Sequence, residues 1–188
     1  MNRISGRAQI LLGIVATLLL TGLSLAAVAL FHGASGPGWR GFPAAGGCSI
    51  PNLPGTVVNV ATMDMAGRMM GGGIMGGGMR LAADRATVAH GEVTFLVTNV
   101  GQISHEMVIL PLSGTRAAGT RPIGGDGQVD EAGSLGEASA TCAEGEGQGI
   151  LPRTAAWVTV NLPAGRYELV CNLPGHYQAG MYTQLTVT

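Results

Sequence analysis

The sequence predicts an all-β domain, either a two-sheet sandwich or a small barrel, behind one apolar N-terminal segment. Short runs rich in β-branched residues recur from residue 56 to the C-terminus, and turns rich in Gly and Pro separate them. No amphipathic helical period appears in that part of the chain. Hydrophobic residues make up 46% of the 188 residues, which is enough to build a packed core.

The N-terminal apolar segment covers residues 10–31, carries no charge and follows Arg3 and Arg7. A helix of about 20 such residues can span a bilayer, so we expect an uncleaved membrane anchor. The alternative is a signal peptide cleaved near Ala27-Val28-Ala29. Both interpretations place the remainder of the chain outside the cytoplasm, because the arginines stay inside.

Residues 1–32 are therefore expected to be the anchor or signal, residues 33–55 a linker rich in Gly and Pro, and residues 56–188 the folded domain. Within the domain we expect strands at residues 56–62, 79–88, 92–99, 106–110, 157–162, 166–171 and 184–188. The turn Pro163-Ala164-Gly165 is expected to join two of these strands as a hairpin. Two segments interrupt the pattern, a Met/Gly-rich loop at 63–79 and a long insertion at 113–150.

The charge composition excludes several classes of function. Charged residues are only 11% and the net charge is −1, so the chain has no basic surface for nucleic acid. All ten basic residues are arginines. A Schiff-base lysine or a phosphate-binding loop with its lysine is therefore impossible.

One segment near the C-terminus has the spacing of a metal site. In CNLPGHYQAGM the pattern C-x4-H-x4-M places Cys171, His176 and Met181 around a Pro-Gly turn between two expected strands. One loop can then present a thiolate, an imidazole and a thioether to a single point. Soft sulfur ligands together with imidazole favour copper.

A trigonal copper site of this kind needs a second histidine from elsewhere. His32 lies at the membrane end, and His90 lies in a turn before the strand at 92–99. His105 opens an apolar strand, where its side chain can face the loop between two later strands. We therefore select His105.

The motifs N-x5-H-E-M-V-I-L and Y-x-L-V-C-N-L-P-G-H-Y-x-x-G-M resemble those of the cupredoxins, most closely the sulfocyanin, rusticyanin and auracyanin type. The resemblance covers roughly residues 56–188. It implies a Greek-key β-sandwich and one mononuclear type 1 copper with His105, Cys171, His176 and Met181 as ligands. Many cupredoxins have Asn or Ser directly after the first histidine, where it helps to pin the ligand loops, whereas this chain has Glu106.

Four protein ligands would leave no open position on the metal for a substrate, so we expect an electron carrier rather than an enzyme, with no small-molecule substrate. No His-x-His or Cys-x3-Cys pattern is present for additional copper centres. The expected partners are redox proteins of a membrane electron-transfer chain, with electrons passing through the edge of His176.

The competing interpretation is a copper chaperone or storage protein that binds Cu(I) through its methionines, because thioethers select Cu(I). The methionines concerned are Met63, Met65, Met69, Met70, Met75 and Met79. The alternative is that this segment is only a flexible loop.

Two cysteines remain beside Cys171, namely Cys48 and Cys142. An oxidising compartment would permit a disulfide between them. A bonded pair and two free thiols are both compatible with the sequence.

Overall fold

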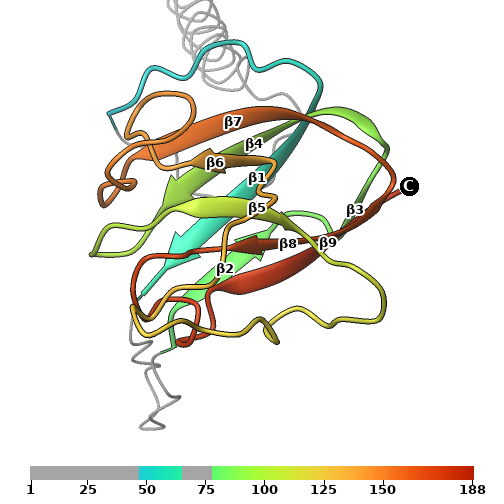
Figure 1. Cartoon of the computed structure of the whole chain (residues 1–188). Helices are drawn as coiled ribbons and strands as arrows, with labels where there is room; N and C mark the ends of the chain where they lie inside the picture. Colours follow the sequence, from blue (N-terminus) through green and yellow to red (C-terminus); the bar gives the residue numbers. More distant parts are fainter. Residues whose placement is uncertain (1–46, 65–77) are drawn as a thin grey trace, which may run out of the picture. The chain divides into compact units, whose positions relative to one another are not determined.

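Two β-sheets packed face to face form the part of the chain that the computed structural model describes, residues 47–64 and 78–188 (Figure 1). The first sheet has the order β2-β1-β4-β7, with strands β1 (Thr56–Met63), β2 (Arg80–Ala83), β4 (Gly91–Asn99) and β7 (Ala155–Leu162). The second has the order β3-β9-β8-β5-β6, with strands β3 (Thr87–Val88), β5 (Met107–Pro111), β6 (Gly136–Ala138), β8 (Gly165–Val170) and β9 (Tyr182–Val187). The described residues contain no helix, so the expected all-β sandwich is confirmed.

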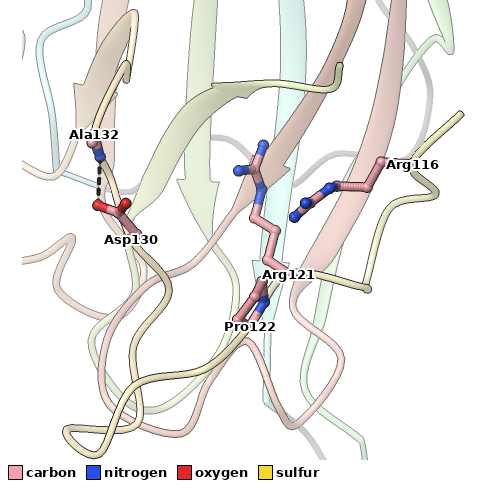
Figure 2. A pocket seen from close by; sticks show the side chains of 5 residues that line it. All are labelled: Arg116, Arg121, Pro122, Asp130 and Ala132. Atoms are coloured by element: carbon pink, nitrogen blue, oxygen red, sulfur yellow. Dashed lines mark hydrogen bonds between the residues drawn. The ribbon is translucent and has the colours of Figure 1, made fainter. Parts of the chain in front are cut away.

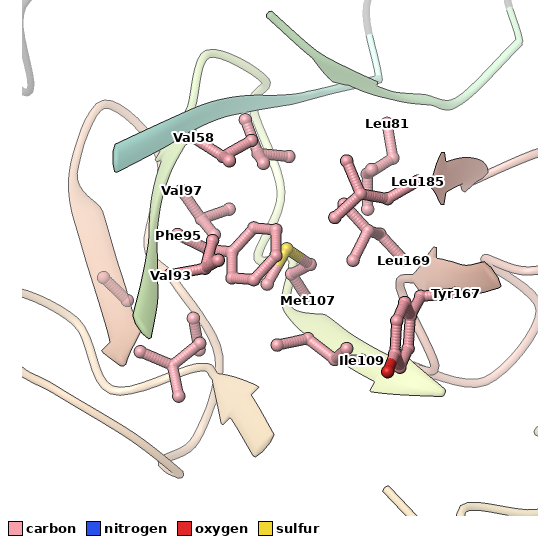
Figure 3. Close-up of a cluster of buried hydrophobic side chains, with 14 of the residues drawn as sticks. Val58, Leu81, Val93, Phe95, Val97, Met107, Ile109, Tyr167, Leu169 and Leu185 are labelled. Carbon is pink, nitrogen blue, oxygen red and sulfur yellow. The ribbon is translucent and has the colours of Figure 1, made fainter. Parts of the chain in front are cut away.

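The core lies between the sheets and follows the alternation of each strand. In β4 the side chains of Val93, Phe95 and Val97 are fully buried and point into this core, where they join Leu169 of β8 and Leu185 of β9 (Figure 3). Successive side chains of a strand face opposite sides, so every second residue of β4 reaches the other sheet. Burying each such side chain stabilises the fold by about 1.5–3 kcal/mol.

The predicted hairpin at Pro163-Ala164-Gly165 is wrong. β7 pairs with β4 in the first sheet, whereas β8 pairs with β5 and β9 in the second. The turn therefore carries the chain from one sheet to the other, which lets both strands bury their apolar side chains against the common core. The hydroxyl of Tyr167 donates to the Pro163 carbonyl over 2.7 Å and closes this crossing.

The strand expected at residues 79–88 is divided between the two sheets. β2 pairs with β1, and β3 pairs with β9. The break falls at Asp84 and Arg85. The Asp84 N–H still donates to the Asn59 carbonyl of β1 over 2.8 Å, and its carboxylate accepts from the side chains of Asn59 and Arg85. The short strand β6 within the expected 113–150 insertion was not predicted, because its sequence Gly-Glu-Ala lacks β-branched residues.

Residues 47–55, the C-terminal part of the expected linker, lie against the sandwich. Cys48 and Cys142 form a disulfide, and the Thr94 hydroxyl donates to the Pro54 carbonyl over 2.6 Å. The disulfide ties the chain before β1 to the part of the 113–150 insertion that follows β6.

The apolar segment 10–31 and residues 65–77 of the Met/Gly-rich loop lie outside the described residues. Among the residues described, no helix is long and apolar enough to cross a membrane.

Replacing Cys48 and Cys142 together by Ser is expected to lower the free energy of unfolding of the metal-free protein by about 4–5 kcal/mol. The cross-link joins residues 94 positions apart, so its loss frees a long loop in the unfolded chain. Equilibrium urea unfolding of the protein and of the double variant measures this difference. Equal unfolding free energies would contradict the stabilising role of the disulfide.

Candidate metal centre

His105, Cys171 and His176 come together at one end of the sandwich, as the sequence predicts. One donor atom from each residue lies within 4.8 Å of the donor atoms of the other two. The Nδ1 atom of His176 is 3.3 Å from both the Nδ1 atom of His105 and the Sγ atom of Cys171. His105 and Cys171 are fully buried, and His176 is 9% exposed.

His105 is held by its backbone just before β5. Its N–H donates to the Ile150 carbonyl over 3.2 Å, and the Ile150 N–H donates to the His105 carbonyl over 2.6 Å. The Asn99 side-chain amide donates to the carbonyls of Ile103 and Ile150 and accepts from the Gly101 N–H. The asparagine six residues before His105 in the motif therefore shapes the loop that carries the histidine.

The loop from Cys171 to Met181 is closed by its own backbone. The Cys171 N–H donates to the Met181 carbonyl over 2.9 Å, and the Met181 N–H donates to the His176 carbonyl over 3.2 Å. Gly175 and Gly180 have φ values of +81° and +101°, which strongly favour glycine. Met181 is fully buried and joins the same core cluster as Cys171.

Glu106 links the two ligand-bearing segments, although it stands where many cupredoxins have Asn or Ser. Its backbone N–H donates to Cys171 Sγ over 3.4 Å, and its carboxyl oxygen accepts from the Asn172 N–H over 3.1 Å. The backbone contact to the sulfur does not depend on the side chain. The two ligand-bearing segments are therefore joined here by a carboxyl group, where many cupredoxins have an amide or hydroxyl.

The insertion at 113–150 covers the loop that carries Cys171 and His176. The Asn172 side chain accepts from the Val129 N–H over 2.7 Å and donates to the Val129 carbonyl over 3.0 Å. The Gly175 N–H donates to the Gly127 carbonyl. The sequence indicates this segment only as a long insertion and does not reveal the role of Asn172. Its place directly after Cys171 was the available signal.

A second buried polar cluster anchors the insertion beside the site. Glu168, fully buried on β8, accepts from the Tyr177 hydroxyl over 2.9 Å and from Arg121 Nε over 2.6 Å. Burial raises the pKa of Tyr177 to about 12, so its hydroxyl remains a donor at neutral pH. This cluster holds Tyr177, the residue that directly follows His176, in place.

A surface pocket of about 370 Å³ lies within the insertion and not at the metal centre (Figure 2). Its lining residues are Arg116, Arg121, Pro122, Asp130 and Ala132. The Arg121 guanidinium is already paired with Glu168, and Asp130 accepts from the Ala132 N–H. None of the three clustered Cys and His residues lines this pocket.

The protonation states suit a metal. Burial lowers the pKa of both His105 and His176, so both imidazoles are neutral near pH 7. Burial also raises the pKa of the Cys171 thiol to about 12. A metal must therefore displace the thiol proton, and its binding releases that proton.

A family model described as the sulfocyanin (SoxE) domain matches residues 83–188. The chain belongs to the sulfocyanin family. That match includes His105, Cys171, His176 and Met181, and it confirms the resemblance drawn from the two motifs. No curated protein matches the chain significantly.

Several solved structures are similar to this sulfocyanin-family chain. Dithionite-reduced auracyanin from Roseiflexus castenholzii is 19% identical with a TM-score of 0.44, covering 73% of this chain and 99% of that one. Auracyanin A from Chloroflexus aurantiacus is 17% identical with a TM-score of 0.41, covering 70% and 99%. Rusticyanin from Thiobacillus ferrooxidans is 17% identical with a TM-score of 0.41, covering 75% and 86%.

The donor set fits the copper that the sulfocyanin family implies. Two neutral imidazoles and one thiol converge in a buried site, and this combination is that of one type 1 copper centre. Within the described residues, His105, Cys171 and His176 form the only such group of His, Cys and acidic side chains.

Replacing Glu106 by Gln is expected to flatten the pH dependence of stability in the metal-free protein. Burial, together with Glu137 and Glu131, raises the pKa of Glu106 to about 7 from its usual 4.5. The unfolded chain therefore ionises at lower pH, and the native state loses stability as pH rises from 4.5 to 7, by on the order of 3 kcal/mol. Glu106→Gln removes this loss.

Urea unfolding at several pH values between 4 and 8 tests this expectation, with Glu92→Gln as an exposed control. The Glu106→Gln curve should diverge from the wild type above pH 5, whereas the control curve should stay parallel. Parallel curves for both variants would contradict the elevated pKa of Glu106.

Proposed function

We propose that this protein is a membrane-anchored blue copper protein that passes single electrons between redox partners outside the cytoplasm. The observation that carries the proposal is the close grouping of the His105 and His176 imidazoles with the buried Cys171 sulfur. When bound at this site, copper supplies a one-electron couple between Cu(II) and Cu(I).

We assign the ligands as His105, Cys171, His176 and Met181. The Nδ1 atoms of the two histidines and the Cys171 sulfur would hold the copper. Met181 would be the fourth ligand, because its backbone is hydrogen-bonded to both Cys171 and His176 and its side chain is buried with Cys171. Four protein ligands leave no coordination position for a substrate, which favours a carrier over an enzyme.

The protein's contribution to electron transfer is a site that stays fixed. The backbone pairing of His105 with Ile150, the closed Cys171–Met181 loop and the Glu106 contact to sulfur hold the donors independently of the metal. Donors that are pre-positioned need little rearrangement when the charge of the site changes.

His176 is the proposed route for the electron. It is the only one of the three clustered residues with any exposure above zero, and Pro174, Gly175 and Ala179 around it are exposed. This surface is uncharged and small, which suits brief encounters between redox proteins.

The proposed location rests on two features. The Cys48–Cys142 disulfide is typical of proteins outside the cytoplasm, and the uncharged segment 10–31 is long enough for an anchor. Tethering would keep the carrier near membrane-bound donors and acceptors.

Cu(II) added to the purified protein is expected to bind at one copper per chain and give an intense thiolate-to-copper absorption. Cys171→Ser should abolish this absorption, since a hydroxyl cannot replace a soft thiolate. The Cys48→Ser/Cys142→Ser variant is the control and should keep it. Full colour in Cys171→Ser would contradict the proposal, and several Cu(I) per chain would favour storage through the methionine-rich segment.

Met181→Leu is expected to keep the copper and its colour but to raise the reduction potential. The thioether donates weakly to Cu(II), so its removal disfavours the oxidised state. Redox titration of the variant beside Met107→Leu, which alters another fully buried methionine, provides the comparison. An unchanged potential in Met181→Leu would show that Met181 is not the axial ligand.

A further inference from the structure

Asp64, which directly follows β1, lies against the outer nitrogen of His105. Its Oδ1 atom is 3.4 Å from His105 Nε2, on the ring side opposite the Nδ1 atom that faces His176. The Asp64 side chain is 10% exposed and that of His105 is fully buried. A carboxylate therefore contacts the imidazole from outside the proposed ligand set.

The backbone of the loop before His105 is shaped to receive this carboxylate. The Gln102 N–H donates to the same Oδ1 atom over 2.6 Å. At Gly101 a Cβ atom would overlap Asp64 Oδ1 and would also touch His105 Nε2. The glycine thus leaves the space that the carboxylate fills, and two elements distant in sequence meet at one ring.

We propose that Asp64 is a positioning residue for the copper site, a role that rests on the function proposed above. By accepting the Nε2–H of His105, the carboxylate fixes the tautomer whose Nδ1 is free to bind the metal and sets the orientation of the ring. Its negative charge also stabilises Cu(II) more than Cu(I), which lowers the reduction potential.

The charge of Asp64 acts on the pKa of both histidines. Burial lowers the pKa of His105, and the hydrogen bond and charge of Asp64 oppose that lowering. For His176, burial and the neighbouring His105 lower the pKa, and Asp64 again opposes them.

Two substitutions separate positioning from charge. Asp64→Asn keeps an acceptor oxygen but removes the charge, so the copper absorption should stay while Cu(II) affinity falls about tenfold relative to Cu(I). A tenfold change corresponds to a rise of about 59 mV in the potential of a one-electron couple. Asp64→Ala removes the acceptor as well and should weaken Cu(II) binding by about 10–100-fold.

Asp84→Asn is the matched control. Asp84 is also buried and carries the same charge, but its N–H bonds to the Asn59 carbonyl, towards the other end of β1. This variant is expected to lose stability, because the Asp84 carboxylate accepts from Asn59 and Arg85, but its reduction potential should equal that of the wild type. An unchanged potential in Asp64→Asn would overturn the electrostatic part of the proposal.

Nitrogen-15 NMR of the metal-free protein tests the positioning without copper. The wild type should show His105 protonated at Nε2 alone, and Asp64→Ala should show a mixture of the two tautomers. The same single tautomer in Asp64→Ala would overturn the positioning role. If the wild type takes up no copper while this NMR difference is present, the proposed function fails and the contact to His105 stands.

Discussion

The antiparallel pairing of β5 with β8 is the constraint on which the metal centre depends. Val108 lies opposite Val170, so the residues just beyond each strand, Glu106 and Cys171, meet across the same ladder. A shift of one residue in this register would turn Cys171 to the other face of the sheet. The buried apolar side chains of Ile109 and Leu169 oppose each other in the same ladder and hold the register in place.

Burial stabilises the hydrophobic core but disfavours the charged forms of the side chains in the metal site. The same removal from water that stabilises the core favours neutral His105, His176 and Cys171 and a protonated Glu106. Ionising the thiol at neutral pH therefore requires a metal to compensate for the lost solvation. The site is organised by backbone hydrogen bonds, which do not change with protonation, and this explains how its donors converge in the metal-free state.

The insertion at 113–150 is part of the site's architecture. It meets the loop of Cys171 and His176 through Asn172 and Gly175, and it reaches Glu168 through Arg121 and Gly119. Its far end is tied by the disulfide from Cys142 to Cys48. A segment with little strand structure is therefore held at three places, one of which is the loop that carries Cys171 and His176.

Most of the strands and the candidate metal ligands of this protein could be predicted from its sequence alone. Short runs rich in β-branched residues predicted most strands. The C-x4-H-x4-M spacing predicted which side chains could share a metal, because a short loop limits how far its residues can separate. His105 was found because it opens a strand. Asp64 and Ile150 were not found, since each meets His105 only through the packing of segments more than 40 residues away in sequence.

The tertiary structure alone decided which sheet each strand joins. The turn at Pro163-Ala164-Gly165 has the composition of a hairpin turn. It crosses between sheets because β7 pairs with β4 in the first sheet and β8 pairs with β5 in the second. Composition describes how tightly a chain turns, whereas pairing depends on the apolar faces that neighbouring strands must bury together. The protonation of the site was likewise decided by burial, a property of the packed molecule and not of any single residue.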